Sequence, residues 1–437
     1  MRKLIVTLCM LVGGVASSAQ TTLTFEEALA TALDNNYGIK IARNNKEIST
    51  NNLTLGNAGF LPTLSANADR TYGRQSFERE LTTGQEQSVS GAKSQRTSYG
   101  ASLNWTLFDG LSMFSTYGQL EEVSLQQDDQ LRVQVEQVAF SVAIAYYQAA
   151  LENERLKLSS NNIELSEERL RVAKEKYELG KASKLEYLQA QVDLNADKTA
   201  KIRQLEILDL RKLDLLQLMA MSGDTISFEL AYNLQNDPNI DLADVINNIE
   251  TTNPQLTALR RDQVIALKEK EINRGDRFPE VNLFAAYTHS QSQSPAGFAI
   301  ESTSDDITYG LTASWTLFDG FNVQRRIQNA KIQIENSQFA YEEQLLSLVT
   351  AARSRYINYK NNLNLMTLEE ENVEVAKENN EIAQERYQIG LSNPIELREA
   401  QINLINAELR LQNAAFAAKL SEIELKYLSG QLLQKDQ

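Results

Sequence analysis

Trp-Thr-Leu-Phe-Asp-Gly, at residues 105–110, recurs letter for letter at residues 315–320. The same offset of 210 residues carries Tyr-Glu-Leu-Gly at 177–180 to Tyr-Gln-Ile-Gly at 387–390. Earlier in each half the offset is 217, because Phe-Leu-Pro at 60–62 corresponds to Arg-Phe-Pro at 277–279. In a chain of 437 residues, a repeat of this length predicts two copies of one supersecondary unit, related by pseudo-symmetry.

The first 19 residues have the pattern of a secretory signal peptide. Arg2 and Lys3 precede an apolar stretch at residues 4–15, and Ser-Ser-Ala follows at 17–19. The single cysteine, Cys9, lies inside that stretch, so we expect a mature chain without a disulfide or a lipid-anchored cysteine. The expected organisation is a signal peptide (1–19), a first repeat (20–220), a linker (221–240), a second repeat (241–428) and a tail (429–437).

Composition narrows the possible partners. The formal net charge is −15 and would become −17 once Arg2 and Lys3 leave with the signal peptide. Such a charge argues against nucleic acid or a bare anionic lipid surface. After the signal, the sequence contains no apolar run long enough for a membrane helix, so any membrane contact is expected to use β-strands.

The second expected strand of each repeat alternates strictly. Tyr99, Ala101, Leu103 and Trp105 alternate with small or polar residues, and the pattern repeats at 309–317. A ten-residue alternation with one apolar face is typical of a strand in a membrane barrel. A half-buried sheet in a soluble domain remains the alternative. The polar stretches 73–97 and 289–307 are expected to be hairpin tips.

Heptads follow each of these strands. Apolar residues recur every seven positions from Val135 to Tyr177 and from Leu345 to Tyr387, with only Asn380 off the pattern. This register predicts long helices packed in a supercoil. Shorter helices are expected at 24–56 and 184–220, and again at 241–275 and 394–428. The two lengths in each repeat add up to one long helix, so we expect them to stack end to end.

Four strands cannot close a membrane barrel, and an open edge cannot face lipid. Several chains must therefore contribute strands to one barrel, and the same oligomer can cover the heptad faces. The predicted fold is mainly α, internally duplicated, with a long coiled-coil α-barrel and four β-strands per chain that build a membrane β-barrel.

The chain resembles the TolC-type outer-membrane efflux family. The resemblance rests on the duplication, on the Trp-Thr-Leu-Phe-Asp-Gly junction, and on Tyr-x-x-Gly followed by Leu/Ile-Glu and Ala-Gln in each repeat. It implies a homotrimer with twelve strands in the cell outer membrane and an α-barrel in the periplasm. It further implies an exit duct for a tripartite efflux or type I secretion system, with a periplasmic adaptor and an inner-membrane pump as partners.

The family resemblance also suggests roles for the turns between long and returning helices. It implies that Gly180 and Gly390 contact the adaptor, whereas a plain helix C-cap is the simpler interpretation. It implies that Glu396 and Glu399, with Glu186 in the first repeat, line a narrow pore entrance. The alternative is a solvated helix N-terminus, where glutamate is favoured. Ser392 stands where the family often has a basic latch residue, and Arg398, Lys181 and Lys184 are nearby candidates for that role.

Four aromatic residues are candidates for an interfacial girdle: Trp105, Trp315, Tyr99 and Tyr309. Packing within the sheet is the alternative. We expect no enzymatic activity and no cofactor, because His289 is the only histidine and the sequence contains neither a phosphate-binding glycine loop nor a metal-ligand cluster. A periplasmic coiled-coil scaffold with a small soluble β-domain is the competing function. The transported substrate and the energy source of the pump leave no pattern in the sequence.

Overall fold

The computed structural model describes residues 22–80, 82–222, 228–231, 236, 239–294 and 299–433. The predicted signal peptide therefore lies outside the described residues. Two compact units are present, and each is built from both repeats. The sheet unit comprises Ala42–Arg132 and Pro254–Leu346, and the helical unit comprises Met1–Ile41, Val133–Asn253 and Ser347–Gln437.

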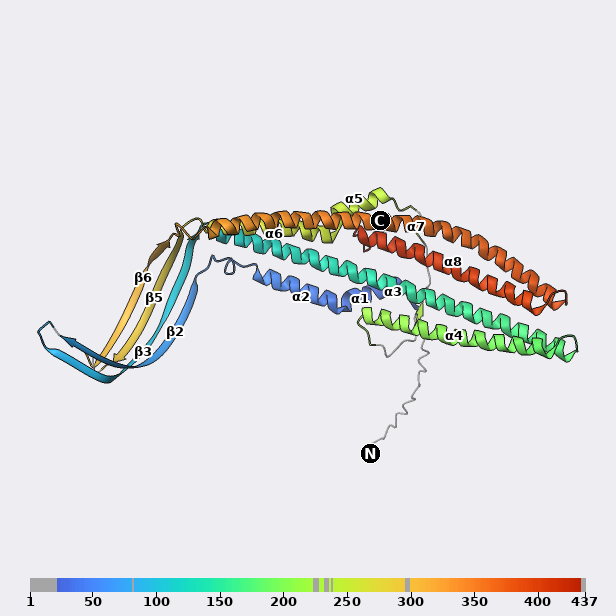
Figure 1. Cartoon of the computed structure of the whole chain (residues 1–437), viewed down its shortest axis with the longest axis horizontal. Coiled ribbons are helices and arrows are strands. Elements are labelled where there is room, and N and C mark those ends of the chain that lie inside the picture. The colour runs from blue at the N-terminus through green and yellow to red at the C-terminus, as the bar shows by residue number, and fades with distance from the viewer. Residues whose placement is uncertain are drawn as a thin grey trace, which may run out of the picture. The chain divides into compact units, whose positions relative to one another are not determined.

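The sheet unit contains four antiparallel strands in the order β2-β3-β5-β6 (Figure 1). Their bounds are β2 Thr63–Glu80, β3 Glu86–Asp109, β5 Glu280–Gln293 and β6 Glu301–Ser314. Leu103 pairs with Leu64 on one side and with Ala285 on the other, so the apolar positions of the alternating pattern share one face. The alternation predicted from the sequence is confirmed. The predicted hairpin tips were too long, because the strands continue well into both polar stretches.

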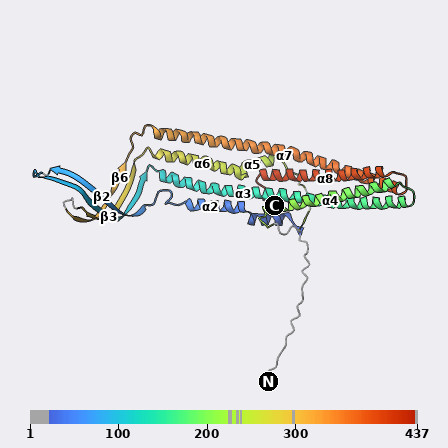
Figure 2. The ribbon, with the colours of Figure 1, turned by 60° about the horizontal axis from the view of Figure 1, so that its bottom comes forward.

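Three helical segments run alongside one another in the sheet unit (Figure 2). Helix α6 (Pro254–Gly275) lies between the first turns of α3 (Ser112–Glu178) and of α7 (Asn322–Gln388). Gln119 of α3 donates to Glu269 of α6 at 3.0 Å, and Arg260 of α6 donates to the Tyr341 hydroxyl of α7 at 2.9 Å. Within the described residues, no helix combines the length and hydrophobicity of a membrane span.

The helical unit consists mainly of two helical hairpins. Helix α3 returns as α4 (Lys184–Leu218), and α7 returns as α8 (Pro394–Leu428). Both long helices have 67 residues and both returning helices have 35. The predicted heptad faces are buried in this unit, including Val142, Ala149, Ala352 and Tyr359, each fully buried. Asn380, the one polar residue in the heptads of α7, is buried as well.

The prediction of single helices at 24–56 and 241–275 was wrong, because each is broken at an asparagine. The first breaks at Asn36, between α1 (Phe25–Asn35) and α2 (Tyr37–Asn52). The second breaks at Asn253, between α5 (Leu242–Thr252) and α6, where a following proline disfavours helical backbone.

Both break asparagines bind the end of a returning helix. Asn36 Nδ2 donates to the Leu218 carbonyl at 3.0 Å, and Asn253 Nδ2 donates to the Leu428 carbonyl at 2.8 Å. Each amide thereby satisfies a terminal carbonyl that no helical N–H can reach. The two contacts are related by the offsets 217 and 210, so the duplication extends to individual hydrogen bonds.

Candidate functional site at the hairpin tips

Each long helix ends at a glycine with left-handed backbone. Gly180 has φ +73° and Gly390 has φ +80°. The N–H of Gly180 donates to the Tyr177 carbonyl at 2.9 Å, and the next N–H, of Lys181, donates to the Lys176 carbonyl at 2.8 Å. This is the geometry of a helix C-cap. A Cβ placed on either glycine would meet no atom within 4 Å, so both turns present open space.

Two of the three predicted gate carboxylates cap the returning helices. Ser183 and Glu186 form a capping box at the start of α4. At the start of α8, Asn393 caps the helix, and Glu396 accepts from Ser392 Oγ at 2.7 Å and from Asn393 Nδ2 at 3.2 Å. Glu399 lies about one turn further along α8 and is exposed. Capping and a position in a pore are compatible, so the gate assignment stays a prediction.

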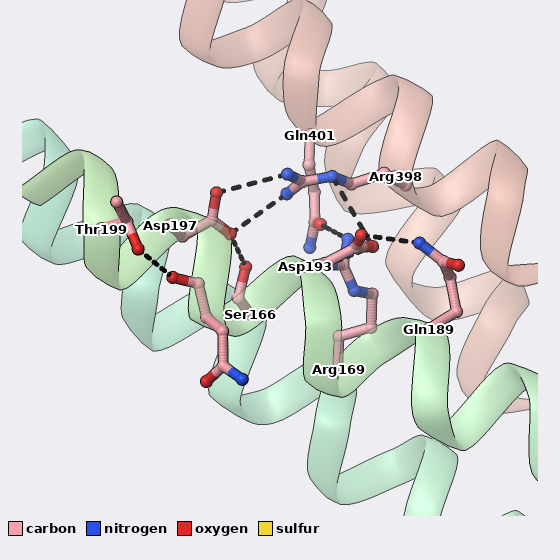
Figure 3. Close-up of polar contacts among 9 residues, drawn as sticks. Ser166, Arg169, Gln189, Asp193, Asp197, Thr199, Arg398 and Gln401 are labelled. Carbon is pink, nitrogen blue, oxygen red and sulfur yellow. Dashed lines mark hydrogen bonds and ion pairs between the residues drawn. The ribbon is translucent and has the colours of Figure 1, made fainter.

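Behind the tips lies a polar cluster that the sequence did not predict (Figure 3). It joins α3, α4 and α8, and we call it the tip clamp: Ser166, Arg169, Asp193, Asp197, Arg398 and Gln401. Arg169 is 3% exposed, and its guanidinium donates to Gln401 Oε1 at 2.9 Å and to Asp193 Oδ2 at 3.1 Å. One buried cation thus binds both the first-repeat hairpin and the second-repeat hairpin.

Asp197 is the acceptor at the other end of the clamp. Its two carboxylate oxygens receive both terminal nitrogens of Arg398, and Ser166 Oγ also donates to it. Burial lowers the pKa of Arg169, and the nearby Arg398 lowers it further. A buried guanidinium of this kind is tolerable only when its partners replace the lost water. The two aspartates and Gln401 supply those partners.

A sequence signal for the clamp existed but was weak. Asp197 continues the apolar row of α4 formed by Ala190 and Leu194, and an acid in such a row suggests a buried partner. The clamp is not duplicated. The offset of 210 carries Arg169, Asp193 and Asp197 to Asn379, Asn403 and Ala407, and it relates Arg398 to Leu188. The ionic contact therefore occurs once per chain.

A groove of about 820 Å³ lies between the two tips. Arg169, Glu186, Tyr387, Arg398 and Glu399 are among the residues that line it. At its wall, Lys176 Nζ lies 3.7 Å from the centre of the Tyr387 ring, and burial lowers the pKa of this lysine. The structure thus brings Glu186 and Glu399 to one groove. Among the described residues, no group of three or more His, Cys, Asp or Glu side chains could hold a metal ion.

The predicted aromatic residues all lie in or next to the sheet. Trp105 Nε1 donates to the Phe60 carbonyl at 2.9 Å, and Trp315 Nε1 donates to the Arg277 carbonyl at 3.1 Å. Tyr99 stacks on His289, with ring centres 4.8 Å apart, and Tyr309 is exposed. These contacts explain why both repeats carry a tryptophan at this place, and they leave the girdle a prediction.

With this geometry in hand, comparison with known proteins is decisive. A sequence profile described as outer membrane efflux protein matches residues 28–224 and again residues 245–431. The chain belongs to this family. The predicted resemblance is confirmed, and the profile's double match follows the internal duplication.

Several characterised relatives match nearly the whole chain. The alkaline protease secretion protein AprF of Pseudomonas aeruginosa is 22% identical, over 93% of this chain and 84% of its own length. The probable efflux pump outer membrane protein TtgC of Pseudomonas putida is 24% identical, over 93% and 82%. The outer membrane protein TolC of Escherichia coli is 19% identical, over 86% and 76%.

Solved structures show the same fold. The CmeC outer membrane channel of Campylobacter jejuni superposes with a TM-score of 0.78 at 16% identity, covering 100% of this chain and 95% of that one. The MtrE outer membrane channel of Neisseria gonorrhoeae, in its open state, gives 0.74 at 16% identity, covering 94% and 90%. The fold predicted from the sequence is thereby confirmed.

Proposed function

We propose that this chain is one subunit of an outer-membrane exit duct, which passively conducts substrates from an inner-membrane pump across the periplasm and the outer membrane. The observation that carries the proposal is family membership over both repeats, together with the fold of an outer membrane channel. The competing role, a periplasmic scaffold with a soluble β-domain, is disfavoured by the sheet. Both of its edge strands, β2 and β6, lack a second partner in this chain.

The functional unit is a homotrimer. Three chains would supply twelve strands and cover the exposed edges of the four-stranded sheets. In such an assembly the tips of six helical hairpins meet at one end, and Glu396, Glu399 and Glu186 contribute carboxylates to a narrow entrance. Like charges at close range attract cations and repel anions, so the entrance would be cation-selective.

The tip clamp gives this entrance its mechanical character. Arg169 and Arg398 bind the α3–α4 hairpin to α8, so the hairpins of one chain would move together when the entrance widens. Equivalent positions in the other direction are neutral, which places the weaker contacts between chains. Opening would therefore separate neighbouring chains before it separates the hairpins of one chain.

The partners are a periplasmic adaptor, docked at the turns around Gly180 and Gly390, and an inner-membrane pump. AprF is named for protease secretion and TtgC for an efflux pump, so both kinds of partner system occur among the relatives. We assign the chain neither an enzymatic role nor a cofactor. Conduction requires none, since the pump supplies the energy.

The test is reconstitution of the purified protein in planar bilayers, together with complementation of a strain that lacks its own duct. The expected results are stepwise ionic currents, recovery in the outer-membrane fraction and restored export. A protein that fractionates with soluble periplasmic proteins and conducts no ions would leave the scaffold as the better explanation.

A further inference from the structure

One sequence adopts two structures within this chain. The first copy of the six-residue motif, at 105–110, continues β3 to Asp109 and pairs with β5. The identical second copy, at 315–320, follows the last residue of β6 and lies outside any strand. Trp105 is 38% exposed, whereas Trp315 is 60% exposed. Because the residues are identical, the difference must come from the partner strand that the second copy lacks.

The duplication says which strand is missing. The offset of 217 carries β2 to β5, and the offset of 210 carries β3 to β6. These offsets already reproduce an observed register, since the pair Ala68–Tyr99 becomes Ala285–Tyr309, which is also paired. The strand that lies beside β6 as β5 lies beside β3 is therefore β2. In this chain β2 is at the far edge of the sheet, so the partner must be β2 of another copy.

We infer that β6 of one copy pairs with β2 of the next, in the register that β3 and β5 have within the chain. The observed pairs Leu103–Ala285 and Tyr99–His289 become Ala313–Ala68 and Tyr309–Tyr72 between copies. The same register extends β6 through Trp315, opposite Ala66. The motif then becomes a strand only on assembly. This inference rests on the proposed oligomeric duct and adds the residues that join its subunits.

The helices beside the sheet support the same neighbour. Within the chain, Glu122 and Asp129 of α3 bind Arg261 of α6 at 3.0 and 3.4 Å. Between copies, the offsets replace these residues by Ile332 and Phe339 of α7, facing α2 at Asn44. Ile332 and Phe339 are 54% and 62% exposed, and Ile48 on α2 is 58% exposed.

An ion pair inside the chain is thus replaced by an apolar contact between chains. Exposed apolar rows on both edge helices match what burial against a second copy would stabilise. At the sheet, the backbone groups of β2 and β6 that lack a partner would carry a high cost in lipid. One neighbour, in one register, satisfies both demands.

The test uses engineered cysteines, because Cys9 is the only native one and lies in the predicted signal peptide. Four substitutions are combined in pairs within one chain: Ala68→Cys, Tyr72→Cys, Tyr309→Cys and Ala313→Cys. The matched pairs are 68 with 313 and 72 with 309. The swapped pairs, 68 with 309 and 72 with 313, use the same substitutions but are displaced by four residues, roughly 13 Å along a strand. Outer membranes are treated with a short bifunctional thiol reagent.

We expect the matched pairs to give covalent oligomers on denaturing gels and the swapped pairs to remain monomeric. Crosslinking of the swapped pairs alone would overturn the register and leave the oligomer standing. Failure of all four pairs, with an oligomer still present in native gels, would show that β2 and β6 do not form the interface. A protein that is monomeric in native gels would instead refute the proposed duct.

Discussion

Arg398 donates through both terminal guanidinium nitrogens to the two carboxylate oxygens of Asp197, at 3.3 and 3.2 Å. The two residues come from different repeats and are 201 positions apart in the chain. Planar, bidentate pairs fix orientation as well as distance. This contact therefore sets how the α3–α4 hairpin lies against α8 near the tips.

Replacing Asp197 with Ala should loosen the tips. The change deprives Arg398 and Ser166 of their shared acceptor, and a lost buried partner typically costs about 1–3 kcal/mol. We expect larger or more frequent open events in single-channel recordings, at unchanged levels in the outer membrane. Asp214→Ala is the matched control, because its ion pair with Arg211 is exposed and surface pairs contribute roughly 0–1 kcal/mol. Equal recordings for the two variants would show that the clamp does not limit opening.

The two faces of the sheet should respond differently to charge. Leu103→Arg or Leu311→Arg places a cation on the apolar face, at a cost of roughly 2–4 kcal/mol near the bilayer midplane. Ser102→Arg and Thr312→Arg, on the opposite face, should be far milder. Outer-membrane yield and heat-modifiable migration measure the effect. Similar losses for both sets would contradict the assignment of the apolar face to lipid.

The pore entrance should be sensitive to multivalent cations. We expect such ions, added from the tip side, to block current through reconstituted channels, because clustered carboxylates bind cations. The double substitution Glu396→Gln and Glu399→Gln should relieve the block, and glutamine at 396 can still accept from Ser392. Glu378→Gln, an exposed site on α7, serves as the control. An unchanged block in the double variant would place the constriction elsewhere.

Gly180 and Gly390 separate docking from capping. Alanine at either position costs on the order of 1 kcal/mol, because the left-handed backbone disfavours a β-carbon. Since a Cβ there meets no atom of the chain, tryptophan should add little further strain within a subunit. We therefore expect Gly180→Trp and Gly390→Trp to reach the outer membrane at near-normal levels and to fail in export complementation. Loss of the protein from the membrane would instead assign these glycines a structural role alone.

Glu408 gives a pH dependence of known sign. Burial raises the pKa of its carboxyl above the ordinary value of 4.5, and Lys377 only partly offsets this. The protonated form is thus favoured in the folded state, so this group stabilises the fold at low pH and that contribution is lost as pH rises through its folded pKa. Glu408→Gln should accordingly raise the thermal midpoint at pH 7, and the gain should vanish below about pH 4.5. A gain of equal size at both pH values would assign the effect to packing.

The sequence by itself determined the duplication, the alternating strands, the heptad helices and the need for more than one chain. Each is a local or periodic property, written in residues that recur at a fixed spacing. The bend at Asn36 was not visible in that way, because its side chain acts on Leu218, 182 residues away. The tip clamp escaped for a related reason: its charges occur in one repeat only and become partners only when three helices meet.

The clearest division lies in the six-residue motif. The sequence determined that the motif occurs twice, and only the tertiary structure decided that 105–110 forms a strand and 315–320 does not. The physical reason is that a strand is defined by hydrogen bonds to a neighbour, which its own residues do not supply. For the first copy that neighbour is β5, and for the second it lies outside this chain.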